Sequence, residues 1–261
     1  MSASSPPRIL GAGTPAKPAS WIAKALALTL NELRLAMRRG ENLLITFIIP
    51  AGVLLVFSAF DLGGTGKPVD RMLPGSMSLA VIASAMVSLA IATGFERSNG
   101  VIKRLGGSPA GTSALVASKT AAVIVVEAVQ IVLLVAIATA IGWSAGPTAS
   151  LALTIGGLVL GTVAFAGLGL LMAGTLRAEA TLALANLLFL VSLVVGGVVM
   201  PLEKLPSTIA AASALLPPAA LTKVLTIGLG GTTGDATESI VVLGVWAVLL
   251  AGLAARKFRW D

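Results

Sequence analysis

The sequence lacks three residue types on which much enzyme chemistry depends: its 261 residues include no cysteine, no histidine and no tyrosine. Without cysteine, the chain cannot form disulfides, thiol nucleophiles, iron–sulfur clusters or cysteine-ligated zinc sites. Without histidine, it cannot ligate haem in the usual way, and it can form neither a Ser–His catalytic pair nor an HExxH metallopeptidase site. We therefore expect no catalytic residue and no metal ligand in this chain.

Charged residues are also scarce. They make up only 11% of the chain, whereas hydrophobic residues make up 56%, and the mean hydropathy is +0.99. An ordinary soluble domain is about 45–50% apolar and about 25% charged. A soluble fold of this length could not cover so much apolar surface with so few charges, so the composition predicts a protein embedded in a lipid bilayer.

Long intervals without charged residues locate the membrane spans. A spanning helix needs roughly 20 mostly apolar residues, and the turn-forming run 142–147 divides the longest charge-free interval, 128–176. We expect one transmembrane domain over 21–258, preceded by a tail, 1–20, that is rich in Ser, Pro, Gly and Ala and is disordered in the cytosol. The sequence predicts an all-α, polytopic membrane protein with six transmembrane helices, at about 43–60, 75–95, 119–141, 151–175, 181–200 and 239–255.

The distribution of positive charge predicts the orientation of these spans. The net charge is +7, and most of the 18 Lys and Arg residues fall in the N-terminal segment, in the loop after the second span and at the C-terminus. By the positive-inside rule both termini lie in the cytoplasm, which agrees with an even number of spans. We expect a multi-pass protein of a bacterial inner membrane, with membrane lipid as a partner and no nucleic-acid partner.

The segment 21–39 has the pattern of an amphipathic helix. Apolar residues recur at steps of three or four, and the cations fall on another side. This is typical of an interfacial helix that lies along the cytoplasmic leaflet and bends into the first span at Gly40; a soluble helix packed on a partner is the alternative. The apolar stripe consists of Ile22, Leu26, Leu30, Leu33 and Met37, and the expected headgroup anchors are Trp21, Lys24, Arg34 and Arg38.

A few polar residues fall inside or at the mouths of the predicted spans. Glu127 is the only acid well inside one, and Gln130, three residues later, could share a polar seam with it. Glu127 either faces a translocation route, or it is protonated or hydrogen-bonded to another helix and serves packing, which we favour. Lys119 begins the third span and is expected to reach the cytoplasmic headgroups. Further candidates to line a pathway are Ser84, Ser88 and Asn186.

The stretch between the last two spans, 201–238, mixes apolar residues with prolines. These prolines prevent one continuous helix, and the apolar run 209–216 is too short to cross a bilayer. We therefore expect one or two short helices that dip into the outer leaflet or cap the bundle from outside. The residues expected to bound this external cap are Pro201, Leu205, Pro206 and Pro217.

The loop after the second span has an ordered set of residues: an acidic–basic pair, a glycine, a basic pair and a proline. In sequence these are Glu96, Arg97, Gly100, Lys103, Arg104 and Pro109. With this loop, the amphipathic N-terminal helix, the six spans and the proline-bounded external cap, the chain resembles the membrane subunit of type-2 ABC exporters over residues 20–258.

The resemblance implies the permease half of an ATP-driven exporter, for example of drugs or lipids. The chain has no Walker A sequence, so it would bind no cofactor itself, and a separate ATPase subunit, present in two copies, would bind ATP and Mg²⁺. A second permease subunit, either a second copy or a sibling chain, would complete the substrate pathway. The cytoplasmic loop 96–113 would dock on the ATPase as a coupling helix.

The residues of this loop suit that role. Gly100 would allow close approach, and Lys103 with Arg104 would fit an acidic groove on a soluble partner. The alternative is that these are cytoplasmic positive charges with no further role. Two other function classes remain open: an ion-coupled secondary carrier that uses Glu127 and, less favoured, an intramembrane enzyme.

Overall fold

In the computed structural model, the described residues are 20–38, 40–60, 67–106, 111–198 and 206–258. The predicted tail lies outside them except for Ser20, and so do Pro109, Pro201 and Leu205. The elements, in chain order, are α1 (Trp21–Arg38), α2 (Gly40–Ala59), α3 (Pro68–Val81), the π-helix η1 (Ile82–Ser88), α4 (Leu89–Ser98), α5 (Val101–Gly106), α6 (Gly111–Ala140), α7 (Leu151–Thr175), α8 (Ala178–Val195), α9 (Ser207–Ala214), α10 (Pro217–Gly228) and α11 (Thr237–Lys257).

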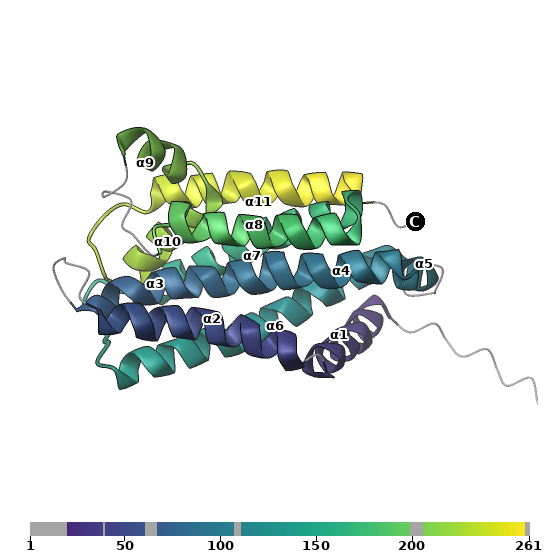
Figure 1. Ribbon diagram of the computed structural model, residues 1–261, viewed down its shortest axis with the longest axis horizontal. Coiled ribbons are helices and arrows are strands. Elements are labelled where there is room, and N and C mark those ends of the chain that lie inside the picture. The colour runs from purple at the N-terminus through teal and green to yellow at the C-terminus, as the bar shows by residue number, and fades with distance from the viewer. Residues whose placement is uncertain (1–19, 39, 61–66, 107–110, 199–205, 259–261) are drawn as a thin grey trace, which may run out of the picture.

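The long helices lie side by side and form a bundle (Figure 1). α1 lies obliquely toward the end of the bundle that carries α5, and α9 lies at the opposite end; we call these the α5 end and the α9 end. The described helical segments that are long and apolar enough to cross a membrane are Pro68–Ser98, Val116–Ala140, Leu151–Thr175, Ala178–Val195 and Thr237–Lys257. The protein is therefore an all-helical, multi-pass membrane protein, as predicted.

The first predicted span, 43–60, corresponds to α2. The apolar part of this helix over Thr46–Ala59 is shorter than the five spanning segments, and Pro50 lies inside it. The pair α9–α10 is apolar enough to count as a sixth span, but the two helices are bent by 80° where they meet. The predicted total of six spans is therefore reached only if α2 or this bent pair is counted as a span.

The second span departs most from the predicted bounds, because it begins at Pro68 rather than near residue 75 and runs without a break to Ser98. We call this segment, made of α3, η1 and α4, the 68–98 rod. Pro68 is tolerated in the first turn, where its missing N–H would have no intrahelical partner. The charged residues Asp70 and Arg71 lie in the same turn, so a rule that ends a span at the first charge places the helix start too late.

The remaining span boundaries differ less. α6 begins at Gly111 rather than at 119, and α8 ends at Val195 rather than at 200. α11 exceeds the predicted 239–255 slightly at both ends. α7 has its predicted bounds because Ser150 caps it: the Ser150 side chain accepts a hydrogen bond from the backbone N–H of Leu153 at 3.3 Å.

The short helices predicted between the last two spans are present. Pro206 directly precedes α9, and Pro217 begins α10. α9 is largely exposed at its end of the bundle, whereas α10 packs against α3, α7 and α11 and buries Leu221 and Leu225 completely. α9 therefore has the position of a cap, and α10 is part of the core.

The 68–98 rod lies at the centre of the bundle. Its residues Leu73 and Ile82 are fully buried and share one core with Phe165 of α7. The two backbones approach closely at Gly169 of α7, where a Cβ atom would lie only 2.9 Å from the carbonyl oxygen of Met86 in η1. Close packing of α7 thus fixes the rod at its π-helical segment.

Candidate functional site

A cavity of about 640 Å³ opens between α1, α2, the 68–98 rod, α6 and α8. Ligand pockets have volumes of about 300–1,000 Å³ and mostly apolar walls, so this cavity is large enough for one small organic molecule. Most of its lining residues are apolar. The polar residues of its wall are Glu32, Thr46, Ser84, Ser88, Glu96, Lys119 and Asn186.

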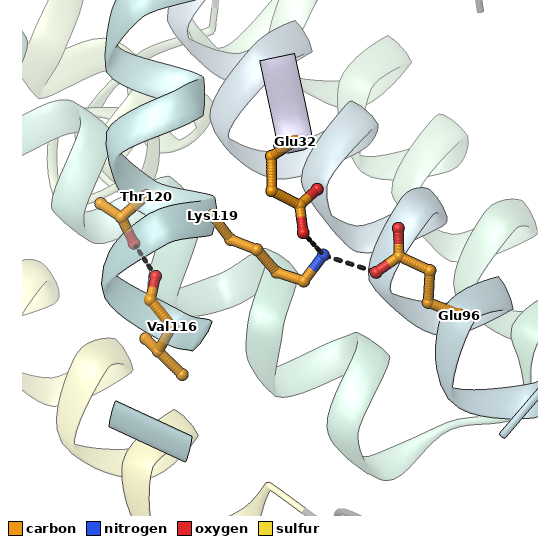
Figure 2. Close-up of polar contacts among 5 residues, drawn as sticks. All are labelled: Glu32, Glu96, Val116, Lys119 and Thr120. Atoms are coloured by element: carbon orange, nitrogen blue, oxygen red, sulfur yellow. Dashed lines mark hydrogen bonds and ion pairs between the residues drawn. The ribbon is translucent and has the colours of Figure 1, made fainter. Parts of the chain in front are cut away.

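In the wall of this cavity one ammonium group joins two carboxylates from different helices. The Nζ atom of Lys119 on α6 lies 2.9 Å from Oε1 of Glu32 on α1 and 2.5 Å from Oε2 of Glu96 on the rod (Figure 2). The side chains of Lys119, Glu32 and Glu96 are 4%, 17% and 10% exposed. Because enclosed charges are costly unless they are paired, these three residues, which we call the ionic triad, hold α1 and α6 against the rod.

The triad differs from what the sequence predicts. Lys119 does not reach outward to lipid headgroups, since its side chain is almost completely enclosed. Glu96 turns into the bundle rather than outward beside Arg97. The physical reason is that α1 packs on α6 and brings Glu32 to Lys119 from 87 positions away, so the ammonium finds two carboxylates inside the protein.

Arg97 contacts a different neighbour from Glu96. Its Nη1 atom donates hydrogen bonds to the carbonyl oxygens of Ala173, at 2.7 Å, and Leu176, at 3.4 Å. These carbonyls lie at the C-terminal end of α7, where backbone oxygens lack intrahelical partners and carry partial negative charge. Glu96 and Arg97 thus fasten the end of the rod to α6 and to α7.

A turn at Asn99 and Gly100 joins the rod to α5. Gly100 has a φ of +69°, and a Cβ atom there would meet nothing within 4 Å. The left-handed backbone therefore favours glycine at this position, and its role in close approach to a partner stays a prediction. Ile102 anchors α5 with a fully buried side chain, Lys103 is exposed, and the side chain of Arg104 lies outside the described part of the chain.

Glu127 and Gln130 lie on one helix but contact different neighbours. Both carboxyl oxygens of Glu127 lie 2.8 Å from Oγ1 of Thr162 on α7. Gln130 donates from Nε2 to the carbonyl oxygen of Thr46 on α2 at 3.0 Å. These contacts do not join Glu127 and Gln130 in the predicted polar seam. Neither residue is among the described residues that line the 640 Å³ cavity. Both contacts join α6 to another helix.

Three other predicted pathway residues do meet in the cavity: Ser84, Ser88 and Asn186. Ser84 donates its hydroxyl proton to the carbonyl oxygen of Ala80 at 2.6 Å. Ser88 lies with its Oγ 3.4 Å from Oγ1 of Thr46. Asn186 is exposed on an otherwise apolar stretch of α8. Polar groups from the rod, from α2 and from α8 thus face one space.

α1 forms one wall of the cavity with Glu32, Leu35 and Ala36. Its predicted helix is present, and its apolar stripe is directed away from the bundle, except that Leu33 is half-buried. An apolar face of this kind suits a helix that lies in a membrane surface. The exposed residues of α1 include Trp21, Ile22, Leu26, Leu30, Arg34, Met37 and Arg38, while Lys24 is half-buried.

The sequence interpretation missed Glu32, Thr46 and Thr162. Glu32 is the only acid in α1, and an acid among several cations was a signal that it has a specific partner. Thr46 and Thr162 are each a single hydroxyl within an apolar run, but threonine is common in packed membrane helices. Only the tertiary contacts identify what these three residues bind.

Comparison with known proteins places these features in one family. The chain matches the family described as ABC-2 type transporter over residues 24–229. That range contains the cavity, the ionic triad and α5. A comparison with curated proteins found no match. Since the family match covers most of the chain, the protein belongs to the ABC-2 type transporter family and is a membrane permease component of an ABC transporter.

Proposed function

We propose that this chain is the transmembrane subunit of an ATP-driven exporter of the bacterial inner membrane. Two permease subunits, either two copies of this chain or this chain with a sibling, enclose the substrate pathway. Two copies of a separate ATPase subunit bind ATP and Mg²⁺ and dock on α5. Both termini of the permease lie in the cytoplasm, so the α5 end is the cytoplasmic end.

The observation that carries this proposal is the continuity of the 68–98 rod. One uninterrupted helix lines the cavity with Ser84 and Ser88 and leads through the Gly100 turn into α5. A displacement of α5 by a docked ATPase therefore passes along a single rod to the cavity wall. The contacts of Glu96 and Arg97 also transmit this displacement to α6 and α7.

The charge at the α5 end supports docking on an acidic partner. Lys103 is exposed on α5. Complementary charge across an interface speeds encounter and fixes register. For directional transport the substrate must bind the inward-open and outward-open states with different affinity, and the cavity is the part of the described structure whose shape such a change would alter.

An ion-coupled carrier built on Glu127 has less support. Glu127 accepts a hydrogen bond from Thr162 of α7 inside the bundle and is not among the described residues that line the cavity. A coupled ion at Glu127 would therefore bind apart from the proposed substrate wall.

Reconstitution with a cognate ABC ATPase in proteoliposomes tests the proposal. Reversing both charges of α5, in K103E/R104E, should leave insertion intact and lower substrate-stimulated ATP hydrolysis and export about tenfold or more, because repulsion replaces attraction at the interface. The matched control R256E/K257E reverses two exposed cations at the end of α11 and should behave like the wild type.

Wild-type hydrolysis and export in K103E/R104E would reject docking through α5. Uphill transport by the permease alone on an ion gradient would reject the ATP-driven mechanism.

A further inference from the structure

We propose that the 640 Å³ cavity binds an amphipathic organic cation, and that the carboxylate of Glu32 selects its positive charge. This inference rests on the proposed function, because it assigns a substrate class to the pathway of the permease. Its basis is the combination of an apolar wall, an excess of carboxylate among the described ionisable lining residues, and hydroxyl oxygens on the facing wall.

The apolar part of the wall requires an apolar ligand body. Leucine, isoleucine, valine, alanine and phenylalanine side chains from all five surrounding segments except α2 line the cavity. A ligand without apolar surface would gain little there, because burial of apolar area supplies most of the binding free energy in such pockets. Phe95 and Leu182 both line the cavity and are partly exposed at the surface of the bundle, so we place the entry for an amphipathic molecule beside them.

The ionisable groups of the described wall are the ionic triad, which has two carboxylates and one ammonium group. The ammonium of Lys119 is engaged by both carboxylates and is the most enclosed of the three side chains, whereas Glu32 is the most exposed. A ligand in the cavity therefore meets carboxylate oxygen before it meets ammonium. In a medium of low dielectric constant this favours a cation over an anion.

The neutral polar groups favour the same ligand charge. The hydroxyl proton of Ser84 is already donated to Ala80, so the Ser84 oxygen offers the cavity only acceptor lone pairs. Thr46 and Ser88 share one hydrogen bond between their hydroxyl groups, so the hydroxyl that donates it is likewise left with acceptor lone pairs, while the other keeps its proton. Acceptors around an apolar space suit a ligand whose polar part donates hydrogen bonds or carries positive charge, such as a protonated amine.

The inference is tested by binding to the purified permease in nanodiscs of zwitterionic phosphatidylcholine, without ATPase or nucleotide. The probes are tetraphenylphosphonium and tetraphenylborate, which have nearly the same size and shape but opposite charge. Equilibrium dialysis against empty nanodiscs should show saturable binding of tetraphenylphosphonium and none of tetraphenylborate. E32Q should weaken tetraphenylphosphonium binding about tenfold or more, whereas E32D, which keeps the charge, should retain the preference.

Two further substitutions keep the test valid if E32Q disturbs the packing of α1. N186D and N186K place opposite charges at an exposed position of the same cavity, and they should strengthen and weaken tetraphenylphosphonium binding, respectively. The matched control E179Q removes an exposed acid at the start of α8, outside the cavity, and should bind like the wild type.

The inference fails if the wild type binds both probes equally, if it prefers tetraphenylborate, or if no saturable binding occurs because lipid fills the cavity. It also fails if well-folded E32Q binds tetraphenylphosphonium with wild-type affinity. Failure of the inference and failure of the proposed function can be told apart: ATP-driven export of another substrate would persist without cation binding, and cation binding would persist if K103E/R104E remained coupled.

Discussion

The Nζ atom of Lys119 lies 2.5 Å from Oε2 of Glu96, and the same ammonium lies 2.9 Å from Glu32. Three segments that are far apart in sequence therefore meet at one enclosed charge. The substitution K119M would leave two carboxylates facing each other without this cation, and removal of one partner from such a group costs about 3–5 kcal/mol. We expect a large fall in the unfolding temperature in detergent, measured by differential scanning fluorimetry.

The control for this prediction is K257M, which removes an exposed cation of α11 and should change the unfolding temperature little. The triple variant E32Q/E96Q/K119M removes all three charges together. It should recover much of the stability, because neutral side chains need no counter-charge. If K119M and K257M were equally stable, the triad would contribute nothing to the fold.

Substitutions of Glu127 can distinguish a role in helix packing from a role in transport. E127Q keeps a polar group beside Thr162 and should export substrate at the wild-type rate. E127A removes the contact with Oγ1 of Thr162, and interhelical hydrogen bonds of this kind contribute about 0.6–2 kcal/mol in membranes. It should therefore unfold at a lower temperature. Loss of export in E127Q at unchanged thermal stability would instead assign Glu127 to the substrate pathway.

Gly100 offers a test of the turn before α5. G100A adds no steric clash, because a Cβ atom would meet nothing within 4 Å, but the φ of +69° is unfavourable for alanine. The cost is about 1–2 kcal/mol, and the strained turn should also lower substrate-stimulated ATP hydrolysis in the reconstituted complex. G100N should be milder, because asparagine adopts this conformation more readily. Equal stability of G100A and the wild type would contradict the left-handed turn.

A pair of glycines in α7 tests the packing of that helix against α11. A Cβ atom at Gly167 would lie 2.7 Å from the backbone nitrogen of Ala251, whereas one at Gly156 would meet nothing within 4 Å. G167A should destabilise the protein by about 1–3 kcal/mol, because backbone cannot move aside as a side chain can. G156A should be neutral or stabilising by up to about 1 kcal/mol, because alanine favours the helix. Thermal unfolding of both variants in one detergent gives the comparison, and equal unfolding temperatures would show that α7 and α11 are not in such close contact.

Much of the fold follows from the sequence, because hydropathy and capping act locally. The turn-forming run 142–147 predicts α7 with its observed bounds, and the structure adds the Ser150 cap at the start of the helix. The helices α9 and α10 were expected from their prolines. The start of the 68–98 rod is not predicted, because the charged residues Asp70 and Arg71 interrupt the apolar run although both lie in the first helical turn. The π-helical form of η1 has no local signal in the sequence.

The candidate site was harder to predict, because it depends on contacts across the bundle. Ser84, Ser88 and Asn186 could be predicted as pathway candidates, since each is a polar residue in an apolar span, and all three line the cavity. The partners of Lys119 could not be predicted, because a count of positive charges assigns each lysine to a side of the membrane and not to a contact. The separation of Glu127 from Gln130 also depends on which helices flank α6, and sequence spacing alone does not determine that.

The winding of the π-helical segment η1 determines how the two ends of the rod are rotated relative to each other around the helix axis. Successive residues of an α-helix are about 100° apart around its axis, and a π turn accommodates an extra residue in the winding. If this wider turn moved along the rod, each residue that it passed would rotate by about 100° around the helix axis, and the helix would remain unbroken. The backbone of Met86, against which Gly169 packs, lies inside the segment. The close approach of Gly169 to the backbone of Met86 therefore lies within the segment whose winding relates Ser84 in the cavity wall to the turn that precedes α5.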